Sequence, residues 1–73
     1  MEIHTLKDIS SQIRSRRKSL DFTQAECAAF CGVGVRFLSE LENGKESIHL
    51  GKTLHVLKML GLNLQLFENG AEQ

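Results

Sequence analysis

Residues 23–44 form the stretch TQAECAAFCGVGVRFLSELENG. It predicts two short helices separated by a turn that contains glycine. Thr23 followed by Glu26 is typical of a capping box at a helix start, and Gly32 suits the left-handed residue that follows many helix ends. Helices of about eight residues are unstable alone in water, so the rest of the chain must hold this pair in place.

The flanking residues predict two more helices and a strand. Leu6, Ile9 and Ile13 fall at helical spacing and indicate a first amphipathic helix. A run of leucines at core spacing indicates a last helix, which ends at Gly61. The tail LNLQLF alternates between two faces, which is typical of a strand. The predicted helices lie at about 6–19, 23–31, 34–42 and 48–60 and the strand at about 62–67, with core leucines at Leu50, Leu54, Leu57 and Leu60.

The predicted strand has no partner strand within a chain of helices. A strand with unpaired edges pairs most simply with the same strand of a second copy, so we predict a homodimer. Leu62, Leu64 and Leu66 face one side of this strand, and Phe67 faces the other side. The candidate dimerisation residues are therefore Leu62, Leu64, Leu66 and Phe67.

Composition fits one small domain that spans residues 1–73. Apolar residues make up 41% and charged residues 25%, as in ordinary soluble domains. A chain of this size buries only about 60% of its unfolded surface, which also favours dimerisation. No apolar run reaches the roughly 20 residues of a membrane span, and the N-terminus MEIHTLKDIS lacks the apolar segment of a signal peptide. We expect a cytoplasmic protein that does not bind membranes.

The formal net charge is zero, yet the charges are unevenly distributed. Residues 1–20 hold five basic and two acidic side chains, a balance of +3, whereas residues 21–73 hold four basic and seven acidic ones, a balance of −3. Two interpretations of the basic excess stay open: a local positive field for phosphate, or cations at the negative end of a helix dipole. The basic cluster consists of Arg14, Arg16, Arg17 and Lys18.

A helix, a turn containing glycine and a second helix together form a helix-turn-helix. Such a motif binds DNA by placing the N-terminal residues of its second helix against base edges in the major groove. The first helix points its N-terminus, with free N–H groups and a positive dipole end, at phosphate. Gln24 at that end is predicted to bind phosphate or, alternatively, to be a solvated first-turn residue.

The second motif helix, with Gly34 at its N-cap, is expected to carry the base contacts. Leu38 and Leu41 are expected to face inward. Arg36 can offer a bidentate fork to guanine, and Val35 and Phe37 can meet thymine methyl groups. Phe37 is equally suited to the core. The candidate DNA contacts are Gln24, Gly34, Val35, Arg36, Phe37, Ser39, Asn43 and Lys45.

Two acidic residues lie in the same helix. Glu40 can accept a hydrogen bond from cytosine N4, although a salt bridge to a nearby arginine or lysine is the stronger alternative. Glu42 is expected to be structural and to pair with the first helix of the chain.

The stretch 22–64 resembles the helix-turn-helix of the Xre/Cro/CI family, which has the lambda-repressor-like fold. Within that family, the phrase GVGVRFLSELENGK, the leucine-rich helix and the tail LNLQLF are similar to HipB-type antitoxins. The resemblance covers roughly residues 6–67. Its signature residues are Thr23-Gln24 at the start of the first motif helix, Ala28 within it, Gly32-Val33 in the turn, and Leu41-Glu42-Asn43-Gly44-Lys45 at the end of the second.

This resemblance implies an all-α, lambda-repressor-like bundle of four to five short helices, with a C-terminal strand that pairs across a dimer. Proteins of this type bind palindromic operators near their own promoters. They often bind a HipA-like Ser/Thr kinase toxin encoded beside them and repress the shared operon. The resemblance matches Gln24 to a phosphate contact, residues 35–39 to the groove-facing stretch, and Asn43 and Lys45 to backbone contacts.

The chain departs from many such relatives at the start of the second motif helix, where it has Val-Arg-Phe rather than polar residues. Base hydrogen bonding therefore rests heavily on Arg36, with the remainder read by methyl contact or DNA shape. The leading hypothesis is a sequence-specific repressor that acts as the antitoxin of a toxin–antitoxin pair. The alternatives are a phage-type or stand-alone regulator of the Xre family, and a protein-interaction module with little DNA specificity.

Sequence patterns for an enzyme or a metal site are weaker than the pattern for a helix-turn-helix. Cys27 and Cys31 are four positions apart on a predicted helix, whereas zinc sites typically have two such pairs at loop spacing. Buried cysteines behave as small apolar residues, and a redox bridge between them is not favoured by helix geometry. No catalytic triad, phosphate loop or paired-carboxylate pattern is present. We predict no enzymatic activity, no metal site and no cofactor.

Overall fold

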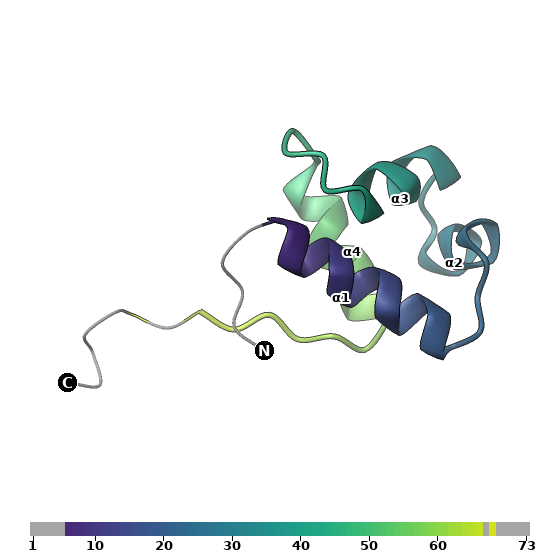
Figure 1. Ribbon diagram of the computed structural model, residues 1–73, viewed down its shortest axis with the longest axis horizontal. Helices are drawn as coiled ribbons and strands as arrows, with labels where there is room; N and C mark the ends of the chain where they lie inside the picture. The colour runs from purple at the N-terminus through teal and green to yellow at the C-terminus, as the bar shows by residue number, and fades with distance from the viewer. Residues whose placement is uncertain (1–5, 67, 69–73) are drawn as a thin grey trace.

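The computed structural model describes residues 6–66 and residue 68, and these residues form four helices. The helices are α1 (Leu6–Ser19), α2 (Gln24–Cys31), α3 (Val35–Glu42) and α4 (Leu50–Met59). Figure 1 shows α1 crossing in front of α4, with α2 and α3 beside each other at one end of the molecule. The described chain is all-α, as predicted, and the predicted limits of the first three helices agree to within one residue.

Local hydrogen bonds explain why the stretch that follows α1 forms a helix, a turn and a second helix. The backbone N–H of Glu26 donates to the Thr23 hydroxyl over 3.1 Å, and the N–H of Thr23 donates to the Glu26 carboxylate over 2.8 Å. This capping box was predicted, and its hydrogen bonds hold the pKa of Glu26 below the usual value. Gly32 ends α2 in the left-handed region at φ 72°, and Gly34 is the N-cap of α3, both as predicted.

One apolar core joins all four helices, and it supplies the stability that α2 and α3 lack on their own. α2 packs against α3 and α4, and α1 packs against α3. The Ser10 hydroxyl of α1 also donates to the Leu41 carbonyl of α3. The inward orientation of Leu38 and Leu41 was predicted from the sequence and is confirmed. The buried apolar residues are Ile13, Cys27, Ala28, Cys31, Leu38, Leu41, Val56, Leu57 and Leu60.

The predicted start of α4 was wrong by two residues. The helix begins at Leu50 rather than near residue 48, because His49 acts as its N-cap. The ring Nδ1 of His49 accepts a hydrogen bond from the Lys52 N–H over 3.1 Å. Histidine is not among the residues that usually cap helix starts, so this cap could not be recognised from the residue type.

The predicted core face of α4 was also wrong in its first half. Leu50 and Leu54 are exposed, with 64% and 44% of their surface accessible, whereas Leu57 and Leu60 are buried as predicted. Thr53 is buried in the first half of the helix instead, and its hydroxyl donates to the His49 carbonyl over 2.9 Å. That local bond satisfies the threonine hydroxyl, so the buried face in the first half of α4 holds this polar residue rather than the predicted Leu50 and Leu54.

The predicted strand is not present in the described part of the tail. Residues 62–66 and residue 68 have no regular secondary structure in this single chain, and they extend away from the helices in Figure 1. Leu62 packs against the core, whereas Leu64 and Leu66 are exposed. Phe67 lies outside the described residues. A strand needs a neighbouring strand for its backbone hydrogen bonds, and pairing between two copies stays a prediction. No helix among the described residues is long and apolar enough to cross a membrane.

Candidate nucleic-acid interface

One face of α3 is buried in the core, and the first turn of the helix is exposed to solvent. Leu38 and Leu41 are fully buried against the core, while Val35 and Arg36 project into solvent from the first turn. The Arg36 side chain is 90% exposed. The eight candidate residues differ in exposure. The exposed ones are Gly34, Val35, Arg36, Asn43 and Lys45, and the half-buried ones are Gln24, Phe37 and Ser39.

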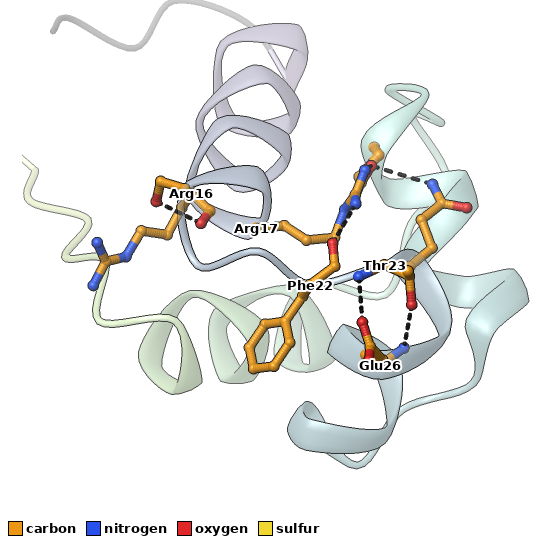
Figure 2. A network of polar contacts seen from close by, with 8 residues as sticks. Arg16, Arg17, Phe22, Thr23 and Glu26 are labelled. Atoms are coloured by element: carbon orange, nitrogen blue, oxygen red, sulfur yellow. Dashed lines mark hydrogen bonds and ion pairs between the residues drawn. The ribbon is translucent and has the colours of Figure 1, made fainter.

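Gln24 begins α2 and is anchored to α3 rather than solvated. Its side-chain amide donates to the Glu42 carboxylate over 3.2 Å. Glu42 also accepts two hydrogen bonds from the guanidinium of Arg17, from Nε over 2.7 Å and from Nη2 over 3.0 Å. Figure 2 shows the Arg17 side chain extending from α1 into this network of polar contacts. The contact confirms that Glu42 pairs with the first helix, and it fixes Gln24 at the N-terminus of α2.

The basic cluster of α1 does not form one exposed patch. Arg17 is buried and also donates to the Phe22 carbonyl over 2.8 Å. Its hydrogen bond to Glu42 raises the pKa of Arg17, so this guanidinium stays charged inside the fold. Arg14, Arg16 and Lys18 are exposed, and Arg16 also donates to the Leu60 carbonyl at the end of α4 over 2.8 Å. Arg17 is therefore not available to bind phosphate, and only the other three cations of the cluster could do so.

The inward position of Arg17 was missed at the sequence level, although a signal for it existed. Arg17 lies four residues after Ile13, which is fully buried. Residues four apart share one face of a helix, so Arg17 continues the apolar stripe of α1. An arginine on an apolar stripe needs a carboxylate partner within the fold, and Glu42 provides it.

Glu40 forms salt bridges with two cations, as the stronger of its two sequence alternatives predicted. Its Oε2 lies 3.5 Å from Nε of Arg36 and accepts a hydrogen bond from Nζ of Lys45 over 3.2 Å. Both cations are candidate DNA contacts. The acidic side chain therefore lies between two of the positive groups of the candidate interface.

Phe37 packs against the core, as its alternative interpretation predicted, although its side chain is only half-buried. The ammonium group of Lys52 lies 5.6 Å from the centroid of the Phe37 ring, within the range of a cation–π contact. Sequence reasoning did not select Lys52, which lies in the first turn of α4. The folded chain brings this lysine beside α3, so it joins the candidate interface.

The two cysteines are buried and unbridged. Burial raises the pKa of the Cys31 thiol to about 11, and burial likewise raises the pKa of Cys27. The interpretation of the pair as small apolar core residues is confirmed. Within the described part of the chain, no group of three or more potential ligands is placed to hold a metal ion.

The sequence matches the helix-turn-helix family over residues 13–67, which include all of α2, the turn and all of α3. The chain belongs to the Xre/Cro/CI-like helix-turn-helix family. This helix-turn-helix protein is 40% identical over 68 residues to the uncharacterized HTH-type transcriptional regulator y4mF of Sinorhizobium fredii (strain NBRC 101917 / NGR234). The alignment covers 93% of this chain and 90% of that regulator.

The fold of this helix-turn-helix protein is similar to that of HipB in solved complexes. One is a HipA–HipB–O2–O3 complex and another is a HipB–O4 20mer complex. Each HipB chain has a TM-score of 0.82 and 22% identity, over 93% of this chain and 96% of the HipB chain. The likeness covers nearly the whole of both chains and concerns the fold.

Proposed function

We propose that this protein is a dimeric, sequence-specific DNA-binding transcriptional repressor. The observation that carries the proposal is the orientation of α3, whose first turn exposes Arg36 while Leu38 and Leu41 fix the opposite face in the core. The major groove of B-DNA is about 12 Å wide and admits one helix. A helix held in this way can insert its first turn without losing its packing.

The other candidate residues suit contacts to the DNA backbone on either side of α3. Gln24 is held at the N-terminus of α2, where free N–H groups favour phosphate. Lys45 follows α3, and Lys52 lies beside it. Phosphate contacts fix the position of a protein on DNA, and base contacts specify sequence. In this arrangement, Arg36 reads bases while Gln24, Lys45 and Lys52 set its position.

Replacing Arg36 with alanine is expected to cost about 1–3 kcal/mol of specific binding per half-site, because a bidentate contact to guanine is lost. Fluorescence anisotropy should be measured with the DNA upstream of the gene and with a scrambled duplex, at two salt concentrations. Arg14→Ala is the matched control, since it removes an exposed arginine of α1. It should change binding to both duplexes equally. A loss that is equal on both duplexes for Arg36→Ala would exclude Arg36 from base reading.

A homodimer accounts for apolar surface that the single chain leaves exposed. Leu50 and Leu54 on α4, and Leu64 and Leu66 in the tail, are all exposed. Residues of α4 and the tail line a groove between them. Pairing of the two tails as strands would cover Leu64 and Leu66 and satisfy the backbone groups of the tail. Such a dimer would present two copies of α3 to half-sites about 34 Å apart on a palindrome.

The double variant Leu64→Asp/Leu66→Asp is expected to weaken dimerisation at least about tenfold, because it places charges on the apolar face of the paired strands. Sedimentation velocity at low micromolar concentration measures the change. Asn63→Asp/Gln65→Glu adds the same charge to the opposite face and should leave most of the dimer intact. If the leucine variant remains as dimeric as the unmodified protein, the strand pairing is wrong.

We further propose that the repressor is the antitoxin of a toxin–antitoxin operon, with a HipA-like Ser/Thr kinase as its partner. The resemblance of residues 32–45 to HipB-type antitoxins supports this role, as does the similarity in fold to HipB in a complex that includes HipA. The neighbouring gene tests it. A kinase gene whose product co-purifies with this chain is expected, whereas a phage lysogeny cassette would assign the chain to the plain repressors.

A further inference from the structure

Glu40 occupies an unusual place for an acidic residue, in the middle of a helix whose outer face is proposed to meet DNA. Its Oε2 contacts Nε of Arg36 at 3.5 Å and Nζ of Lys45 at 3.2 Å. The Glu40 side chain is 30% exposed, against 90% for that of Arg36. The carboxylate is therefore the more enclosed member of the group, and the arginine extends beyond it into solvent.

The contact between Arg36 and Glu40 leaves the terminal nitrogens of the guanidinium available. The contact to Glu40 uses Nε, the nitrogen nearest the backbone. The two terminal nitrogens of a guanidinium form a planar fork that can bind two acceptors at once. An arginine that contacts its carboxylate through Nε can thus offer that fork to guanine O6 and N7. Without the carboxylate, the same flexible side chain is free to turn toward the nearest phosphate.

The negative charge of Glu40 also lowers the affinity of the protein for DNA phosphates of any sequence. Non-specific binding to DNA depends on the number of phosphates that lysine and arginine neutralise. A carboxylate beside Arg36 and Lys45 lowers the positive field that both cations present to phosphate. Exposed ion pairs contribute little to folding in water, so the placement of Glu40 is not explained by stability. When DNA docks and displaces water, the interaction between these charges becomes stronger.

We propose that Glu40 is a specificity-determining residue of the interface. It positions the terminal fork of Arg36 toward a base and reduces the attraction of Arg36 and Lys45 for the phosphates of any sequence. Sequence specificity is the difference between the affinity for the specific site and the affinity for other sequences, and Glu40 acts on both affinities. This inference rests on the proposed function as a sequence-specific DNA-binding protein.

The test is a selection from a duplex library with a randomised central segment, made with the unmodified full chain, Glu40→Gln, Arg36→Ala and the double variant. Glutamine preserves the shape of Glu40 and removes its charge. The control is Glu46→Gln, which removes an exposed carboxylate just after Lys45 and changes net charge equally. Anisotropy titrations then give the affinity of each variant for the selected duplex and for a scrambled one. Circular dichroism checks that each variant is folded.

For Glu40→Gln, we expect the ratio of specific to scrambled affinity to fall about fivefold or more, with tighter binding to the scrambled duplex. Glu46→Gln should keep the ratio. The preference lost by Glu40→Gln should be at the base position that Arg36→Ala also loses, and the double variant should lose little more than Arg36→Ala alone, because Glu40 acts through Arg36.

Three results overturn the inference, and they are distinguishable. If the unmodified chain enriches no sequence, the proposed function fails and the role of Glu40 fails with it. If the unmodified chain selects a sequence but Glu40→Gln keeps both its affinity ratio and its preferred bases, only the role of Glu40 is wrong. A loss of preference at positions that Arg36→Ala does not affect would also contradict it.

Discussion

Replacing Arg17 with methionine is expected to lower the free energy of unfolding by about 3–5 kcal/mol. The substitution removes the cation that pairs with Glu42, whose side chain is only 2% exposed. Glu42 would retain one hydrogen bond from the neutral amide of Gln24 at 3.2 Å. A buried carboxylate with so little compensation is costly, and a chain of this size has a small stability margin.

Urea unfolding followed by circular dichroism measures this loss, at one fixed protein concentration because a dimer makes stability concentration-dependent. Arg14→Met is the matched control, since Arg14 is exposed on the same helix and should change the free energy by less than about 0.5 kcal/mol. The double variant Arg17→Met/Glu42→Leu should recover most of the loss because no unpaired charge remains. Equal effects of Arg17→Met and Arg14→Met would show that the ion pair does not join α1 to α3.

The same ion pair links stability to the candidate interface. Arg17 comes from α1, Glu42 from the last turn of α3 and Gln24 from the first turn of α2. The three side chains therefore fix the relative positions of the two motif helices at their junction with α1. A change in this network is expected to reach, through Gln24, the end of α2 that we propose to face DNA.

Features set by neighbouring residues could be predicted from the sequence. The capping box of Thr23 and Glu26 and the left-handed Gly32 depend on contacts within a few residues. The limits of α2 and α3 followed from these local signals, and the inward face of α3 followed from the spacing of Leu38 and Leu41. Local propensity and apolar periodicity agree in this part of the chain, which is where such reasoning is strongest.

Features set by contacts between distant residues were only partly predictable. The pairing of Arg17 with Glu42 spans 25 positions in the chain. The run of four neighbouring cations in α1 does not by itself indicate which of them pairs with Glu42. Lys52 joins the candidate interface only because α4 folds back beside Phe37. Leu50 and Leu54 are exposed because the first half of α4 buries Thr53 instead, a choice that depends on packing against the other helices. The predicted strand of the tail is a different case, because its hydrogen bonds would come from a second chain and not from distant residues of the same chain.

The second large effect is expected for Leu38→Ala, which should lower the free energy of unfolding by roughly 2–5 kcal/mol. Leu38 is fully buried on the inner face of α3, in the core shared by the four helices. Truncation to alanine removes apolar contact and leaves a cavity that the surrounding side chains fill only in part. A helix of eight residues has no stability of its own to offset that loss.

Val35→Ala on the same helix provides the contrast, because Val35 is 51% exposed and should lose less than about 1 kcal/mol. Urea unfolding measures the stability of both variants, and anisotropy measures their DNA binding under conditions where each is folded. Leu38→Ala is expected to change mainly stability, whereas Val35→Ala is expected to change mainly binding. If Val35→Ala were the more destabilising of the two, the inner and outer faces of α3 would be misassigned, and Arg36, which shares the exposed first turn with Val35, could not be the residue that reads bases.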